Sequence, residues 1–367
     1  PYTTLFRSGS GHILVKAFEV LFEIYKAQGY PENEIPEMIL THNLYGLDIC
    51  DRAAQLSQLA VMMKAREYDR NIFNKVKSLN ICSIHDTNWL DFSVTDEILI
   101  GTANKDKATK QIKLLQEIFK DAKEYGSILK VGGLDFDFWD ERINYFRNNK
   151  TTSLYGQIIN GRLKYIIKQA KIMQQQYECV VANPPYMGNG GMGKYLSDYT
   201  KKNYPNTKSD MSTVFMEKAI EMCSVSGFIS MINIPVWMFI SSYENLRKEI
   251  ILNNTIISML HLGRGIFGSD FGTTSFVIRK ENIIKYKGYF KRLFNKQGAV
   301  DSVDAKEKSF FEKNNKYIFQ QEMFLLIPGY PIAYWASDRV REIFRDACTL
   351  AKIAQPKQGL ATGNNDE

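Results

Sequence analysis

The stretch of residues 180–186, Val-Val-Ala-Asn-Pro-Pro-Tyr, limits what this part of the chain can fold into. Its first three residues are small and apolar, and two are β-branched, which is typical of the end of a buried parallel strand. Pro184 and Pro185 lack a backbone N–H and have a fixed φ, so strand pairing must stop there. Open α/β sheets place their ligands in loops at the carboxyl ends of strands. We therefore expect a functional site at Asn183 and the residues after it.

The four residues Asn183, Pro184, Pro185 and Tyr186 resemble the catalytic loop of S-adenosylmethionine-dependent amino-methyltransferases, most of which methylate the exocyclic nitrogen of adenine in DNA. An adenine amine is a poor nucleophile because its lone pair is delocalised into the ring. The resemblance implies that the Asn183 side-chain oxygen and a carbonyl of the Pro-Pro turn each accept one N–H of the amine, which directs the lone pair toward the methyl group. Tyr186 would offer an aromatic face to a base flipped out of the duplex.

A glycine turn near the start of the chain, residues 8–12 (Ser-Gly-Ser-Gly-His), precedes a predicted amphipathic helix. Four apolar residues fall on one face of that helix: Ile13, Ala17, Leu21 and Ile24. Such a turn lets the backbone approach a ligand closely at a helix N-terminus. In the methyltransferase family the turn holds the cofactor, so we expect Gly9, Ser10 and Gly11 to contact S-adenosylmethionine.

The residues before this turn depart from the family pattern. The family has a strand that ends in an acid or amide, Pro and often Cys, whereas residues 5–8 here are Leu-Phe-Arg-Ser. We therefore expect residues 1–8 to be foreign or truncated sequence, and the cofactor site to be incomplete.

Two acidic residues follow predicted strands. Asp48 ends the strand predicted at residues 43–49, where an acid can accept both ribose hydroxyls of a nucleoside. The alternative is that Asp48 or Asp51 caps the helix predicted from about 52 to 68. Asp86 follows a strand predicted at residues 81–84, where the family places an acid against the adenine amine of the cofactor. The alternative there is a simple turn at residues 86–88.

Residues from about 104 to 176 carry helical patterns and form an expected insertion between the third and fourth strands. One stripe consists of Ile112, Leu115, Ile118, Phe119 and Ala122, closed by Gly126, and a second of Leu163, Ile166, Ile167 and Ala170. This insertion resembles large single-chain DNA adenine methyltransferases, namely the fused type IIG restriction–modification enzymes and, more closely, the BREX-type phage-exclusion (PglX-like) methyltransferases. The resemblance implies an α/β fold with a doubly wound, Rossmann-like methyltransferase core.

Downstream of the Asn-Pro-Pro-Tyr loop, four glycines in residues 188–193 predict a flexible segment that could close over a substrate. A helix is predicted after Asp210, then strands at 227–232 and 255–261 and an edge strand at 272–278. The family places an aromatic residue against the target base in this region, which points to Phe267 or Phe271, although simple core packing is the alternative. We expect Phe267 and Lys208 to contact the substrate.

The composition fits an ordinary globular protein, with 44% hydrophobic and 24% charged residues in 367. We expect a catalytic domain at residues 1–290, and at 291–367 the end of the catalytic region and the start of a target-recognition domain, with both ends truncated. The five cysteines and four histidines do not cluster, so we expect reduced thiols and no metal site. The longest apolar run, residues 228–240, is too short for a bilayer, and the expected location is the cytoplasm.

The net charge of +7 mildly favours a polyanionic partner, and basic residues are grouped. Residues 142–171 contain seven basic and no acidic residues, and residues 285–296 contain five, interleaved with aromatics. Together with residues 194–208, these runs are the expected contacts to a DNA backbone. The alternative for each run is a solvated helix or strand face.

The sequence thus predicts a site-specific DNA adenine-N6 methyltransferase that acts in phage defence or restriction–modification. Its expected partners are double-stranded DNA with a flipped adenine and other defence-system subunits. Two alternatives stay open: the acceptor is a protein glutamine or RNA, or the chain is a DNA-binding component whose cofactor pocket has decayed.

Overall fold

The computed structural model describes residues 4–7, 11–149, 153–266, 272–296, 298–348 and 352–354. Nine strands formed by these residues make one sheet in the order β3-β2-β1-β4-β5-β7-β6-β8-β9. The strands are β1 (Thr4–Arg7), β2 (Leu44–Asp48), β3 (Asn80–Ser83), β4 (Tyr177–Ala182), β5 (Cys223–Asn233), β6 (Thr255–Gly263), β7 (Thr273–Arg279), β8 (Lys287–Arg292) and β9 (Lys316–Gln320).

The strand directions place most strand ends at one edge of the sheet. Strands β3, β2, β1, β4 and β5 are mutually parallel. Strand β7 is antiparallel to both β5 and β6, so β6 runs with the parallel set, and β8 runs parallel to β6. The carboxyl ends of all strands except β7 and β9 therefore lie along the same edge, which is where a ligand is expected in an open α/β sheet.

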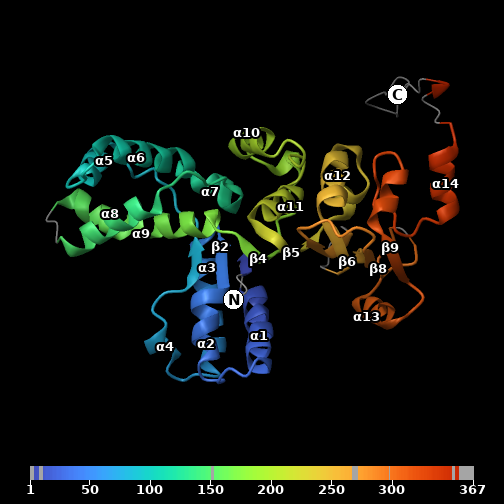
Figure 1. The fold of residues 1–367 in the computed structure, drawn as a ribbon, viewed down its shortest axis with the longest axis horizontal. Helices are drawn as coiled ribbons and strands as arrows, with labels where there is room; N and C mark the ends of the chain where they lie inside the picture. The colour runs from blue at the N-terminus through green and yellow to red at the C-terminus, as the bar shows by residue number, and fades with distance from the viewer. Residues whose placement is uncertain are drawn as a thin grey trace, which may run out of the picture.

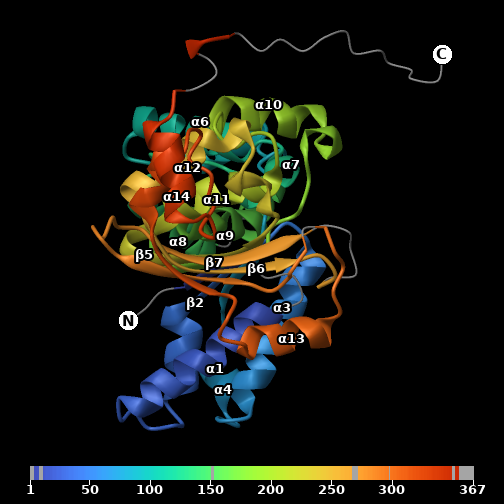
Figure 2. The ribbon, with the colours of Figure 1, turned by 90° about the vertical axis from the view of Figure 1, so that its right-hand side faces the viewer.

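Helices cover both faces of the sheet, as Figures 1 and 2 show. On one face lie α1 (His12–Ala27), α2 (Ile35–Met38), α3 (Asp51–Arg66), α4 (Ile72–Lys75) and α13 (Val303–Phe311). On the other face lie α5 (Phe92–Leu99), α6 (Lys105–Phe119), α7 (Ala122–Tyr125), α8 (Phe136–Asn148), α9 (Leu154–Gln174), α10 (Lys194–Asn203), α11 (Met211–Met222), α12 (Glu244–Asn253) and α14 (Asp338–Asp346). The α/β class expected from the sequence is confirmed.

Short 3-10 or π turns connect these elements. They are η1 (Ile39–Asn43), η2 (Gly126–Ile128), η3 (Asn189–Gly191), η4 (Pro235–Met238), η5 (Ser241–Tyr243) and η6 (Gln321–Leu326).

The strand that precedes the glycine turn is part of the sheet. Residues 4–7 form β1, which pairs in parallel with β2 on one side and β4 on the other. The first strand of the sheet is therefore present, because strand pairing is made by backbone groups and tolerates a change in the side-chain motif. The expectation of an incomplete cofactor site concerns the residue types at positions 5–8 and stays a prediction.

The buried face of α1 overlaps the expected apolar face only in part, since Leu21 is buried while Ile13 and Ala17 are partly buried at its border. Its buried residues are Leu14, Phe18, Leu21 and Phe22, while Ile24 is 42% exposed. The helix has two apolar faces, and the one with the two phenylalanines packs inward, with Phe22 stacked on Tyr68 at 3.9 Å between ring centroids. The other face lines an open apolar groove of about 920 Å³ beside β4 and β5.

The expected helical insertion is present, and both of its apolar stripes face inward. Ile112, Leu115, Phe119 and Ala122 are fully buried, and Ile118 is half-buried against the same core. The second stripe on α9 is also buried. The helical region begins with α5 at Phe92, earlier than residue 104, because Asp91 caps a short helix by accepting the Val94 N–H at 2.9 Å. An eight-residue helix gives too little periodicity to be recognised in the sequence.

Strand β7 was expected at an edge of the sheet, and that expectation was wrong. It lies between β5 and β6, and two further strands, β8 and β9, extend the sheet beyond β6. The alternating burial of β7 fits an interior strand with both faces covered in part. The basic run at residues 285–296 forms β8 and the residues around it. The strand was not predicted because the sequence analysis interpreted these charges as contacts to DNA or as a solvated face.

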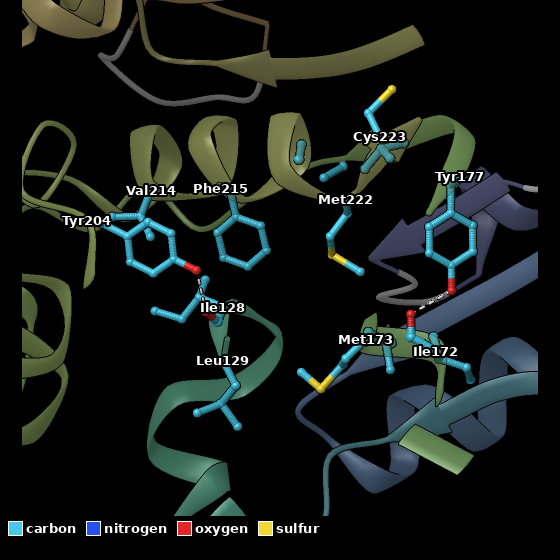
Figure 3. Packing of buried hydrophobic residues seen from close by; sticks show 14 of the residues in the cluster. Ile128, Leu129, Ile172, Met173, Tyr177, Tyr204, Val214, Phe215, Met222 and Cys223 are labelled. Carbon is cyan, nitrogen blue, oxygen red and sulfur yellow. Dashed lines mark hydrogen bonds between the residues drawn. The ribbon is translucent and has the colours of Figure 1, made fainter. Parts of the chain in front are cut away.

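Buried tyrosines link the insertion to the sheet and to the chain that follows α10 (Figure 3). The Tyr204 hydroxyl donates to the Ile128 carbonyl at 2.5 Å, and the Tyr177 hydroxyl donates to the Ile172 carbonyl at 2.7 Å. Burial raises the pKa of both phenols, so both remain protonated donors. The Tyr204 bond joins η2 of the insertion to the chain after α10, and the Tyr177 bond joins the end of α9 to the amino end of β4.

Candidate active site

The loop after β4 presents an asparagine to solvent on a buried support. Asn183 is exposed, Pro184 behind it is buried, and Pro185 and Tyr186 are half-buried. Within the described residues, no hydrogen bond occupies the side-chain amide of Asn183. The amide oxygen is therefore available to an incoming donor, on a backbone that two prolines stiffen.

Tyr186 is anchored at the end of the neighbouring strand. Its hydroxyl lies 3.4 Å from the Ile232 carbonyl of β5, a long and weak hydrogen bond. Burial raises the pKa of this phenol, so it stays neutral. The anchored ring leaves part of its surface exposed beside Asn183, which suits a stacking surface for a planar ligand.

The glycine-rich segment after the loop is held against the start of α11. The Met211 N–H donates to the Met187 carbonyl at 2.9 Å, and the Asn189 N–H donates to the Ser209 carbonyl at 3.1 Å. Lys208 directly precedes Ser209 and is exposed. We call residues 204–210 the strap. The positive charge of Lys208 therefore lies on the strap, which borders the Asn183 loop.

The glycine turn is partly described. Gly11 has φ +89° and caps the start of α1, and a Cβ there would lie 2.9 Å from the Cα of Ser57. Both observations require glycine at this position. Gly9 and Ser10, the other expected cofactor contacts, lie outside the described residues.

Asp48 sits at the carboxyl end of β2 and is 6% exposed. Its Oδ1 accepts the backbone N–H of Cys50 at 2.9 Å, which forms a local turn. Helix α3 begins after Cys50 and has no side-chain cap, so the alternative that Asp48 or Asp51 caps it was wrong. Two strand spacings, roughly 10 Å, separate the ends of β2 and β4.

Asp86 follows β3 at the same edge and is half-buried. Its Oδ1 accepts the Asn88 N–H at 3.1 Å, so the turn considered as an alternative is present and holds the carboxylate. Beside Asp86 lies a cavity of about 350 Å³. Its lining includes two rings and two cations, from Trp89, Tyr165, Lys123 and Arg162.

Two features of this edge, Ile49 and Gly126, were not predicted from the sequence. Ile49 follows Asp48 directly and is 41% exposed, although it is apolar. Gly126 of the insertion packs against it, since a Cβ at Gly126 would lie 3.4 Å from Ile49 Cδ1. The sequence signal was an apolar residue placed directly after an acid at the end of a strand.

Two cations of the expected DNA-contact runs, Arg142 and Lys291, are buried. Arg142 is 1% exposed, and its guanidinium donates to the Ile100 carbonyl at 2.8 Å and to Glu141 Oε1 at 2.7 Å. Lys291 is buried in β8 and donates to the carbonyls of Phe310 and Glu312. These two cations hold the fold together because buried backbone carbonyls need donors. The expectation that they face phosphates was wrong.

Other expected features are placed as follows. Phe267 and Phe271 lie outside the described residues. No cluster of His, Cys, Asp and Glu suited to a metal ion occurs among the residues that were placed. None of the helices that the structure describes is both long and apolar enough to span a bilayer.

The chain is similar to known proteins that are all described as methylases or methyltransferases. The family model described as "Eco57I restriction-modification methylase" matches residues 42–267. The "Adenine-specific methyltransferase BrxX" of Escherichia coli O9:H4 (strain HS) is 37% identical over 362 residues, which cover 90% of this chain and 29% of that protein. The "Adenine-specific methyltransferase PglX" of Lacticaseibacillus casei (strain Zhang) is 35% identical over 377 residues, 97% of this chain and 30% of that protein.

Among solved structures, the DrdV–DNA complex superposes with a TM-score of 0.52 at 10% identity, over 92% of this chain and 28% of that one. At this identity the likeness concerns the fold. The chain spans less than a third of the length of each curated relative.

Proposed function

Because the chain belongs to the Eco57I restriction-modification methylase family, we propose that it is the catalytic part of a site-specific DNA methyltransferase that transfers a methyl group from S-adenosylmethionine to adenine N6. The observation that carries this proposal is one sheet edge bearing the exposed Asn183 in an Asn-Pro-Pro-Tyr loop and two carboxylates, Asp48 and Asp86. The names of the BrxX and PglX relatives support adenine as the acceptor. The strand order with helices on both faces supports a doubly wound, Rossmann-like core.

The residues at the β1–β3 end of this edge fit S-adenosylmethionine. Gly11 has a positive φ and packs closely on Ser57, which sets the path of the glycine turn at the start of α1. Asp48 can accept the ribose hydroxyls of the cofactor. The exposed Ile49 offers an apolar surface to the adenine ring, and Asp86 can accept its amine beside the cavity of about 350 Å³. When bound, the cofactor supplies an electrophilic methyl group.

The residues at the β4 end of the edge fit the acceptor. The Asn183 amide oxygen and a carbonyl of the Pro-Pro turn each accept one N–H of the adenine amine, which turns its lone pair toward the cofactor. This arrangement favours the positive charge that grows on nitrogen during transfer, without a charged base. Tyr186 stacks on the target base, which reaches the site by leaving the duplex.

The remaining expectations follow from this role. A DNA-modifying enzyme acts in the cytoplasm on double-stranded DNA, and a family of restriction–modification proteins suits work with other defence subunits. The alternative of a decayed cofactor pocket rests on residues 5–8, which lack the acid and proline of the family although residues 4–7 form β1 in the sheet.

The experiment is to incubate the protein with radiolabelled S-adenosylmethionine and duplex DNA, then digest the DNA and identify the labelled nucleoside. We expect N6-methyladenosine in its deoxy form. Parallel incubations with RNA and with whole-cell protein test the other acceptors, and label found only there would overturn the proposal.

A further inference from the structure

The turn that carries Asp86 is held by a residue of the helical insertion. The Asn88 side-chain amide exchanges two hydrogen bonds with Asp121: Asn88 Nδ2 donates to Asp121 Oδ1 at 2.8 Å, and the Asp121 N–H donates to Asn88 Oδ1 at 3.0 Å. The Asn88 N–H in turn donates to Asp86 Oδ1 at 3.1 Å. Asp121 thus reaches the Asp86 carboxylate through one intermediate residue.

Asp121 adopts a backbone conformation that supports this contact. Its φ of 51° lies in the left-handed region, which L-residues other than Gly, Asn and Asp rarely adopt. Such a conformation persists where surrounding contacts fix it, and it is found preferentially at functional sites. Here it joins α6 to α7 and directs both the N–H and the carboxylate of Asp121 at Asn88.

The residues around Asp121 bind the other parts of the same edge. We call residues 119–130 the bridging segment. The Phe119 carbonyl accepts the Thr87 N–H at 3.0 Å, and Lys123 pairs with Asp51 at 3.0 Å, just after the Asp48 turn. The Ser83 hydroxyl and the Lys123 ammonium hold the pKa of Asp51 below its ordinary value, so this pair stays charged.

The far end of the bridging segment meets the chain that follows the Asn183 loop. The Lys130 N–H donates to the Tyr199 hydroxyl at 2.9 Å, and the Ile128 carbonyl accepts from Tyr204 (Figure 3). Figure 1 shows α7 above the end of β2, with α10 beyond it. The bridging segment therefore contacts both acid-bearing turns and α10.

We propose that Asp121 is a positioning residue of the cofactor site, which orients Asp86 through Asn88 for the adenine amine of the cofactor. The helical insertion is then a part of the cofactor site and not only an addition that faces DNA. This inference rests on the proposed function, because Asp86 matters only if the cofactor binds at this edge.

The test uses three single variants and one double variant, and it measures cofactor affinity by calorimetry. Asp121→Gly removes the carboxylate and suits the positive φ, so the fold is preserved. It should raise the Kd of S-adenosylmethionine about tenfold, the factor that one net hydrogen bond is worth. It should leave kcat at saturating cofactor nearly unchanged. Asp121→Asn keeps the Oδ1 acceptor and tolerates this φ, so its affinity for S-adenosylmethionine should equal that of the wild-type protein. Asn88→Ala should match Asp121→Gly, and the double variant should be no weaker than either.

A matched control is Asp135→Ala, which removes the side-chain cap of α8 and the ion pair with Lys107 in the same insertion, neither of which involves the Asp86 turn. An equal loss of affinity in that variant would mean that the insertion acts only through stability, and would overturn the proposal. So would wild-type affinity in Asp121→Gly when the wild-type protein binds and methylates. Absence of cofactor binding by the wild-type protein would instead overturn the proposed function itself.

Discussion

At Asn183, the exposed amide stands on a buried proline, so the side chain can be removed without opening the core. We predict that Asn183→Ala lowers kcat for methyl transfer by a factor on the order of a hundred or more, as when one preorganised hydrogen-bonding group is lost from a transition state. The Kd of S-adenosylmethionine should stay nearly unchanged, because Asn183 acts on the acceptor amine. Single-turnover transfer assays and calorimetry measure the two quantities.

The control for this substitution is Asn189→Ala, which removes an exposed amide from the same loop region six residues later in the 3-10 turn η3. It should keep most of the activity. If Asn183→Ala lost cofactor binding and transfer together, Asn183 would be a structural end of β4 and not an acceptor contact.

His261 makes the stability of the far half of the sheet depend on pH. Burial, with smaller effects from Arg292 and Lys306, lowers the pKa of this imidazole to about 4. Below pH 6.5 the unfolded chain takes up a proton that the folded chain refuses, so the free energy of unfolding falls as the pH falls toward 4. The loss should reach about 2 kcal/mol by pH 5.

Urea unfolding at pH 7.5 and pH 5 measures this loss, and His261→Gln is the comparison, since glutamine does not titrate. The variant should lose about 2 kcal/mol less than the wild-type protein between the two pH values. Equal losses would show that His261 is protonated in the folded protein as easily as in the unfolded chain.

At the scale of the elements, β8 depends on a glycine. A Cβ at Gly288 would lie 2.4 Å from the Ile256 carbonyl oxygen of β6 and 3.1 Å from the Phe290 ring. Gly288→Ala must therefore shift backbone, and we expect a loss of about 1–3 kcal/mol in the free energy of unfolding. Gly190→Ala is the control, because nothing lies within 4 Å of the added methyl group. An equal, small effect in both variants would mean that β8 shifts without cost.

The elements also show what could be predicted from the sequence and why. A polar residue ends or closely follows each of the strands β2, β3 and β4. Local patterns were therefore enough to place Asp48, Asp86 and Asn183 at or just after strand ends. The interior position of β7 could not be found this way, because it depends on β8 and β9 pairing beyond β6. The burial of Arg142 and Lys291 could not be predicted either, because the carbonyl groups that accept their hydrogen bonds are distant in sequence.

The bridging segment was missed for a related reason. Asp121 and Asn88 are separated by 33 residues, and neither belongs to a motif. Their reciprocal hydrogen bonds exist only once α6 has packed beside the β3 turn. A sequence pattern reports periodicity along one element, whereas the contacts that position a ligand join different elements.

At the scale of the whole molecule, the carboxyl edge of the sheet has its cofactor end at β1–β3 and its acceptor end at β4, with α10 and the 204–210 strap beside the acceptor end. Of the basic runs, residues 194–208 follow the Asn183 loop most closely along the chain, and Lys208 is exposed in the strap that is bonded to that loop region. A duplex that delivers a base to Asn183 would therefore pass over this strap, and phosphate contacts there would position the DNA without reading its sequence.

We predict that Lys208→Gln weakens binding to random duplex DNA and lowers the slope of log affinity against log salt by about 0.9, the value for one phosphate contact. The matched control is Lys77→Gln, which removes an exposed lysine outside the basic runs, three residues before the start of β3 and so at the opposite edge of the sheet from Asn183. Both variants change the net charge equally, so a general field effect would weaken both to the same extent. Fluorescence anisotropy with two unrelated duplexes at several salt concentrations separates the two cases. A loss confined to Lys208→Gln and equal for both duplexes would place the DNA backbone beside the strap. Equal losses in both variants would leave only the attraction of a basic protein for a polyanion, and DNA would have to approach Asn183 from another side.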